Sequence, residues 1–179
     1  QALDTETFTA LPKASRETGP ESIGVPGMLA GWDEAHRRWG TRPWPTLLQP
    51  AIEAARKGVV VDHYDHHALL EAQDKPGVGG GFELFAPDGQ VPTPGDRITQ
   101  PDQARSLSLI AEGGASVLYG GELGRRMADH IRSIGGQMTI KDLENYRPVV
   151  RTALSVEYAG AQIYAAPPPA TGGATLLLA

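Results

Sequence analysis

The sequence has no cysteine among its 179 residues. Disulfide bonds, a thiolate nucleophile and zinc sites with cysteine ligands are therefore excluded. The sequence also lacks any apolar run of the roughly 18 residues that a membrane-spanning helix requires. The fold must then rest on the packing of apolar side chains, which make up 40% of the residues and suffice for one core.

Basic residues are outnumbered, with 16 lysines and arginines against 21 aspartates and glutamates, and the formal net charge is -5 at pH 7. The composition argues against a nucleic-acid partner, because no basic stripe is present to neutralise phosphates. We expect the pairs Arg37-Arg38 and Arg125-Arg126 to lie on solvated helix faces. The chain has no initiator methionine and no signal sequence, and it opens at Gln1 on strand-like residues, so we expect the N-terminus to be a cut end.

Periodicity predicts an α+β fold in which the helices are segregated as one lobe. Polar and apolar residues alternate over residues 1–11, which predicts a strand. A helical lobe is expected over about 24–147, followed by strand segments over 148–166 that turn at Ala159-Gly160. The start of one more helix is expected over 171–179. The chain should thus form a single partial domain, with no internal repeat.

Within the lobe, apolar residues recur at helical spacing, and glycines end several of the helices. The expected helices cover residues 26–40, 45–57, 62–74, 121–133 and 142–146, and another opens at Pro101. The first of them carries Met28, Trp32 and Trp39 on one continuous face. Residues 76–96 are rich in glycine and proline, which predicts a long loop with a small hairpin around Asp88-Gly89.

The segment Pro167-Pro168-Pro169-Ala170-Thr171-Gly172-Gly173 should join the last strand to the last helix. Three prolines remove three backbone donors and hold the chain extended, so the strand through Tyr164 must end there. We expect Thr171 to cap the helix that follows, and the two glycines to allow a tight turn into it.

This segment resembles a motif of the gamma-glutamyltransferases (gamma-glutamyl transpeptidases), and further resemblances follow in the family's order from about Ile23 to Thr175. The other matching motifs are Gly24-Val25-Pro26-Gly27, Arg38-Trp39-Gly40-Thr41, Leu48-Gln49-Pro50-Ala51-Ile52, Gly95-Asp96 with Gln100-Pro101-Asp102, Tyr119 with Gly121-Glu122-Leu123, and Gly135-Gly136 with Asp142-Leu143. Together they cover nearly the whole chain.

The resemblance implies part of the large subunit of an N-terminal-nucleophile (Ntn) hydrolase, with its αββα fold. In this family the nucleophile is a threonine that self-cleavage frees at the start of the small subunit, and the threonine's own α-amine activates its hydroxyl. No such motif occurs here, so we expect no catalytic residue in this chain, and the chain alone should be inactive. The implied partner is the small subunit of the same precursor, and the implied substrate is glutathione or a related amide. The resemblance implies no cofactor and no metal, and family habit suggests export to the periplasm or medium.

One substrate-contacting residue of the family is expected within the chain. The family segment that resembles residues 2–7 carries an arginine that grips the substrate's α-carboxylate, for which arginine geometry is suited. Here Glu6 or Thr7 falls at that position, and Arg16 matches a later arginine. A glutamate facing a carboxylate would repel it. The change therefore predicts a different acyl preference, as in the cephalosporin-acylase-like members.

Three other patterns are better explained without chemistry. His63 and His67 have the spacing of two metal ligands on a helix, but no third ligand is specified and Asp62 is better used as a helix cap. The glycine-rich residues 77–81 lack the Lys-Ser/Thr pair of a phosphate loop, and Phe82 follows instead of a helix. Ser116 does not fit the nucleophile-elbow pattern. We therefore predict that His63 and His67 lie at a solvated helix start, that residues 77–81 form a flexible loop, and that Ser116 is a turn or cap residue.

Three functions follow from these observations. The leading one is a gamma-glutamyltransferase or glutathione hydrolase that passes a gamma-glutamyl group to water or an amine. The second is a related Ntn acylase with a non-glutamyl substrate, and the third is a non-catalytic helical interaction module. Missing segments should leave apolar strand surface exposed, which would favour self-association.

Overall fold

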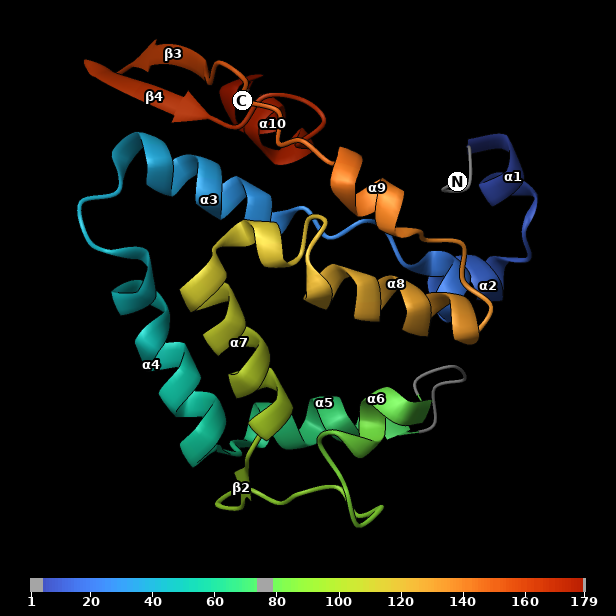
Figure 1. Cartoon of the computed structure of the whole chain (residues 1–179). Helices are drawn as coiled ribbons and strands as arrows, with labels where there is room; N and C mark the ends of the chain where they lie inside the picture. The colour runs from blue at the N-terminus through green and yellow to red at the C-terminus, as the bar shows by residue number, and fades with distance from the viewer. Residues whose placement is uncertain (1–4, 74–78, 179) are drawn as a thin grey trace. The chain divides into compact units, whose positions relative to one another are not determined.

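The computed structural model describes residues 5–73 and 79–178 (Figure 1). Contacts divide the chain between Arg147 and Pro148 into a first unit and a second unit. The first unit is built of helices with one short pair of strands, and the second unit is a β-hairpin followed by a helix. The predicted α+β class, mostly helical with few strands, is confirmed.

The helices of the first unit are α1 Thr5–Ala10, α2 Lys13–Glu17, η1 Pro20–Ser22, α3 Met28–Trp39, α4 Trp44–Lys57, α5 His63–Gln73, α6 Gly79–Glu83, α7 Pro101–Gly113, η2 Ala115–Val117, α8 Glu122–Ser133 and α9 Ile140–Asn145. Its strands β1 (Val59–Val60) and β2 (Arg97–Ile98) pair antiparallel, with Val59 opposite Ile98. The predicted helices of the lobe are confirmed, with ends that differ by at most two residues.

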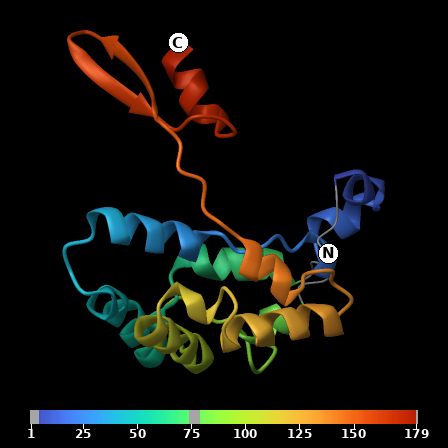
Figure 2. The same cartoon turned by 45° about the horizontal axis from the view of Figure 1, so that its top comes forward.

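Helices α4 and α7 lie side by side in both views (Figures 1 and 2). The Trp44 indole N–H donates to the carbonyl of Ile110 at 3.0 Å, and the Gln100 N–H donates to the carbonyl of Ala55 at 2.8 Å. Gly58 follows the last residue of α4, and its φ of 83° lets the chain turn from α4 into β1. Glycine adopts a positive φ readily, whereas other residues adopt it only at a cost in free energy. The packing of α4 against α7 thus brings residue 44 next to residue 110 and closes the loop between them.

The core of the first unit lies where α8 and α9 meet. Its centre is Leu143, which is 0% exposed and packs with Leu118, Ile131 and Met138. Helix α9 is fixed there by a capping box, in which Thr139 N–H donates to Asp142 Oδ2 at 2.8 Å and Asp142 N–H donates to Thr139 Oγ1 at 3.4 Å. Partly buried side chains surround this cluster, namely Val25, Leu29, Tyr119, Leu123, Met127 and Ile140.

Tyr119 attaches the start of α3 to this core. Its hydroxyl donates to the carbonyl of Pro26 at 2.7 Å and accepts the N–H of Ala30 at 3.0 Å. The ring stacks on Tyr146 with 5.8 Å between centroids. Burial raises the pKa of the Tyr119 hydroxyl, which keeps it protonated and able to donate. The hydroxyl thereby satisfies an N–H in the first turn of α3, where helices lack internal partners.

The apolar face predicted on α3 is exposed. Met28 is 66% exposed, Trp32 57% and Trp39 72%, and the Arg38 guanidinium lies over the Trp39 ring at 5.9 Å. On the other side of the helix, Leu29 packs against the core cluster and Ala30 is buried.

The strand predicted over residues 1–11 is wrong for the residues described, because Thr5–Ala10 form helix α1. A strand needs a neighbour for its backbone donors and acceptors, whereas a helix satisfies them locally. The Thr9 hydroxyl adds to this local bonding, since it donates to the carbonyls of Thr5 and Glu6 at 2.9 and 3.0 Å. The first four residues lie outside the described part.

The long loop predicted over residues 76–96 also needs correction, because it contains helix α6. The N–H groups of Phe85 and Ala86 donate to the carbonyl of Phe82 at 2.9 and 3.0 Å, and Ala86 is 1% exposed. Burial of Ala86 thus holds this turn despite the low helix propensity of glycine. Residues 74–78 lie outside the described part, and the remainder up to Asp96 is irregular, with φ of 71° at Gly89. The hairpin predicted around Asp88-Gly89 is therefore wrong, because these residues form a turn with no strands beside it.

The second unit contains β3 Leu154–Tyr158, β4 Ala161–Ala165 and α10 Thr171–Leu178. The strands pair antiparallel from Leu154 opposite Ala165 to Tyr158 opposite Ala161. The predicted turn at Ala159-Gly160 is confirmed, and its positive φ angles of 50° and 79° suit the twist of a two-residue hairpin turn. Of the strand segments predicted over 148–166, the first begins only at Leu154, because its partner β4 is five residues long.

Candidate functional site

Glu6 and Thr7, the predicted carboxylate-contacting positions, lie in α1 with exposed side chains. Glu6 belongs to the first turn of the helix. A negative charge in that turn interacts favourably with the helix dipole and with unpaired backbone N–H groups. The sequence therefore places Glu6 where its charge also supports the local structure.

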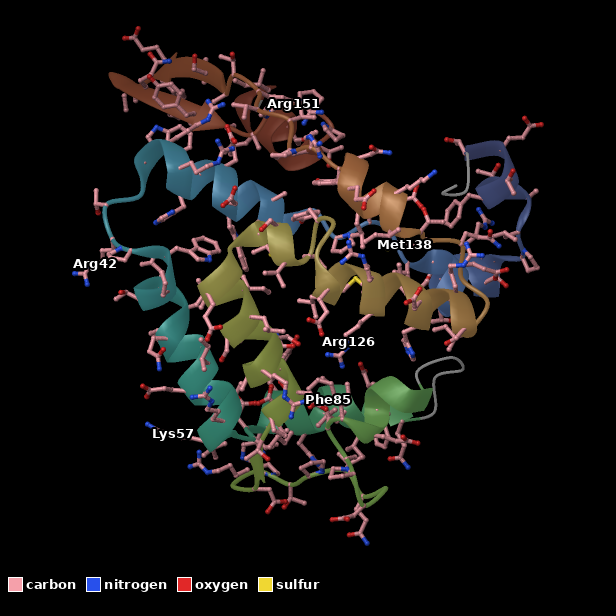
Figure 3. The ribbon with its side chains drawn as sticks, in the orientation of Figure 1. Arg42, Lys57, Phe85, Arg126, Met138 and Arg151 are labelled. Carbon is pink, nitrogen blue, oxygen red and sulfur yellow. The ribbon has the colours of Figure 1, made fainter. Side chains whose placement is uncertain are left out.

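A cavity of about 230 Å³ lies next to α1. Phe8 is the residue of α1 that lines it, whereas Glu6 and Thr7 do not. Other parts of the wall are formed by Glu21 and Ser22 of η1 and by Met138, which is buried. Met138 is labelled in Figure 3. A half-buried carboxylate beside apolar walls favours a ligand group that is basic or donates hydrogen bonds. Sequence reasoning missed this cavity because three separate segments build it.

Arg16 lies on α2, and its Nε is buried without a hydrogen-bond partner among residues 5–73 and 79–178. Its neighbours Lys13 and Glu17 form an exposed ion pair with each other at 3.5 Å. Unmatched donors of this kind are uncommon in folded proteins. The Arg16 guanidinium therefore has capacity for an acceptor that the described residues do not supply.

The segment from Pro167 to Gly173 joins β4 to α10, as predicted. The Ala170 N–H donates to the carbonyl of Pro167 at 3.2 Å. Helix α10 begins at Thr171 itself, so Thr171 is the first helical residue and not the cap predicted for it. A methyl group on Gly173 would overlap the carbonyl oxygen of Ala166, so only glycine fits at this joint. The Thr171 nitrogen belongs to a peptide bond and has no free amine, so Thr171 cannot activate its own hydroxyl as an N-terminal threonine does.

Two of the three histidines of α5 make ordinary structural contacts, and His63 is exposed at the start of the helix. The predicted cap is confirmed, since the Asp65 N–H donates to Asp62 Oδ1 at 2.8 Å. His66 Nδ1 lies 2.7 Å from the carbonyl oxygen of Pro92, and His67 lies 3.5 Å from Glu71. Among the described residues no three metal-ligating side chains come together.

Ser116 lies in the short helix η2, where its hydroxyl donates to the carbonyl of Gly113 at 2.9 Å. Its hydrogen bond is local, made to a residue three positions earlier in the chain. The prediction of a turn residue is therefore confirmed.

Known proteins resemble this chain in sequence and in structure. The family model described as Gamma-glutamyltranspeptidase matches residues 1–179. The glutathione hydrolase proenzyme of Bacillus subtilis (strain 168) is 36% identical over 172 residues, which are 96% of this chain and 29% of that protein. The acylase ACY 1 proenzyme of Pseudomonas sp. (strain V22) is 41% identical over 156 residues, which are 87% of this chain and 28% of that protein. The crystal structure of Helicobacter pylori gamma-glutamyltranspeptidase matches with a TM-score of 0.88 at 27% identity, over 99% of this chain and 51% of that chain.

The described residues thus have the fold of part of an Ntn hydrolase. Within that class, the chain belongs to the gamma-glutamyltranspeptidase family. It spans less than a third of the length of these two curated relatives. No helix in the described part of the chain is long and apolar enough to cross a membrane.

Proposed function

We propose that this chain is part of an enzyme that cleaves a gamma-glutamyl amide and passes the gamma-glutamyl group to water or to an amine. The match of the family model to residues 1–179 carries the proposal. Glutathione is the proposed donor, because the Bacillus subtilis relative is a glutathione hydrolase. That relative is a proenzyme, which supports a small subunit of the same precursor as the partner.

In the proposed reaction the nucleophile is an N-terminal threonine outside this chain. Its α-amine takes the hydroxyl proton while the hydroxyl oxygen attacks the carbonyl carbon of the amide. The carbon–nitrogen bond breaks, the amine leaves with that proton, and an ester joins the acyl group to the threonine. Water or an acceptor amine then attacks the ester and frees the threonine. The chain alone is proposed to be inactive, since the nucleophile and the oxyanion hole lie elsewhere.

A second function, hydrolysis of a non-glutamyl amide, is favoured by two observations. The Pseudomonas relative at 41% identity is an acylase. Glu6 and Thr7 stand at the positions proposed to replace the family's carboxylate-binding arginine.

Kinetic assays of the intact enzyme separate these functions. We expect gamma-glutamyl-p-nitroanilide to be cleaved with a higher kcat/KM than acyl amides that lack the α-amino and α-carboxylate groups. A preference for the acyl amides would instead support the acylase. Failure to cleave either substrate would support a non-catalytic interaction module. The 179-residue chain alone serves as the control and should cleave neither.

Replacing Glu6 with arginine in the intact enzyme is expected to raise kcat/KM for gamma-glutamyl substrates by about tenfold, because a charge-assisted hydrogen bond would replace a repulsion. Glu17→Arg is the matched control, since it makes the same change of charge at an exposed position of α2. The assignment of Glu6 would be wrong if Glu6→Arg brought no gain, or if Glu17→Arg brought the same gain.

A further inference from the structure

An apolar cavity of about 290 Å³ lies on the first unit, between the β1–β2 pair, α5 and Phe85. Its apolar wall includes Val61, Leu69, Phe85 and Ile98. Phe85 is labelled in Figure 3. The volume is close to the lower limit of about 300 Å³ for small-molecule sites. The cavity can therefore hold a ligand body of about one aromatic ring.

The walls of this cavity are fixed by backbone contacts. Val61 is 3% exposed, and its N–H donates to the carbonyl of Asp96 at 2.9 Å. The pairing of Val59 with Ile98 holds the two strands together. On the opposite side, the contact of His66 with the carbonyl of Pro92 at 2.7 Å ties α5 to the segment before β2. A ligand would thus find the cavity already formed, which lowers the entropic cost of binding.

Two polar side chains, those of Asp65 and Gln100, also line the cavity. Asp65 Oδ2 accepts the N–H of Asp62 at 3.3 Å, and no lysine or arginine of the described residues forms an ion pair with Asp65.

Nearby basic groups have other partners. Arg97 directs Nη1 to the carbonyl of Gly58 at 2.6 Å, and Lys57 pairs with Glu53 at 2.9 Å. The carboxylate of Asp65, exposed in the first turn of α5, therefore has no lysine or arginine partner among the described residues and lies at the edge of an apolar cavity. This combination favours a cation that carries an apolar body.

We propose that the cavity is a binding site for a small organic amine. The apolar body, of about one ring, would lie against Val61, Leu69 and Phe85, and the ammonium group would donate to the Asp65 carboxylate. The amide oxygen of Gln100 supplies a further acceptor on the wall.

An NMR titration of the 179-residue chain at pH 7 with 2-phenylethylamine tests the proposal. We expect saturable shifts of the Val61, Leu69 and Ile98 methyl signals, with 2-phenylethanol, the neutral analogue, binding about tenfold more weakly. Methylamine, which has the charge without the ring, should leave these signals unchanged. It controls for the general attraction of cations to a chain of net charge -5. Equal affinity for the amine and the alcohol, or no binding of either, would overturn the proposal.

Two variants locate the ligand. Ala68 lines the cavity from an exposed position of α5, so Ala68→Phe should fill the cavity and abolish binding. Leu70→Phe, on the same helix but outside the lining, is the matched control and should bind normally. Asp65→Asn keeps an acceptor for the Asp62 N–H and should make the amine bind no better than the alcohol. Unchanged binding of the amine by both Ala68→Phe and Asp65→Asn would show that it binds elsewhere.

Discussion

Leu143→Ala is expected to lower the free energy of unfolding of the first unit by about 3 kcal/mol. Leu143 is 0% exposed at the centre of the cluster with Leu118, Ile131 and Met138. Removing most of a fully buried leucine loses its transfer free energy and leaves a cavity that the neighbours fill only in part. The loss is large beside a typical total stability of about 5–15 kcal/mol.

Urea unfolding followed by tryptophan fluorescence measures this loss. All three tryptophans lie in the first unit, and Trp44 is half-buried between α4 and α7, so the signal reports on that unit alone. Leu47→Ala, at a leucine of α4 that is 48% exposed, is the control and should cost no more than about 0.5 kcal/mol. Equal losses in the two variants would mean that α9 does not carry the core.

Gly124→Ala should lower the free energy of unfolding by about 2 kcal/mol, although alanine is the better helix former. Gly124 lies in α8, and a methyl group there would overlap the carbonyl oxygen of Leu118 and approach Leu143 Cδ1 to 3.3 Å. The overlap involves backbone, which cannot move aside as a flexible side chain can. Helix α8 must then shift away from the core.

Gly31→Ala supplies a matched control with the opposite sign. Gly31 lies within α3, and a methyl group there would meet nothing within 4 Å. The same substitution should therefore stabilise the chain by about 0.5–1 kcal/mol through helix propensity alone. The two glycine-to-alanine substitutions should thus shift the midpoint of urea unfolding in opposite directions. A stabilised Gly124→Ala variant would show that α8 does not approach Leu118 this closely.

Local signals predict most helices of the first unit. Asp62 begins α5 and Gly58 ends α4 because capping and termination depend on a few neighbouring residues. Periodicity identifies an apolar face on α3 but cannot tell whether another part of the molecule covers it. In the described structure Leu29 packs against the core cluster and Ala30 is buried, while Trp32 and Trp39 are exposed.

Features that depend on distant residues were missed. Strands β1 and β2 are two residues long each, so they leave no alternating pattern, and their pairing depends on the return of the chain through α5 and α6. The cavity beside Asp65 combines residues from Val59 to Gln100, and no motif links them. The resemblance to the family supplied the class of enzyme, whereas the position proposed for Glu6 depends on a segment that folds as a helix instead of the expected strand.

Three long-range contacts of the first unit are nested one inside another, and this order bears on how the chain folds. Val59 meets Ile98, Trp44 meets Ile110 across 66 residues, and Ala30 meets Tyr119 across 89 residues. Once an inner contact has formed, the next one outward has to close only the short segments between them, so its entropic cost is far below that of the whole loop. Residues 30–119 can therefore assemble outward from the β1–β2 pair, with the Tyr119 hydroxyl engaging the start of α3 as the last of these steps.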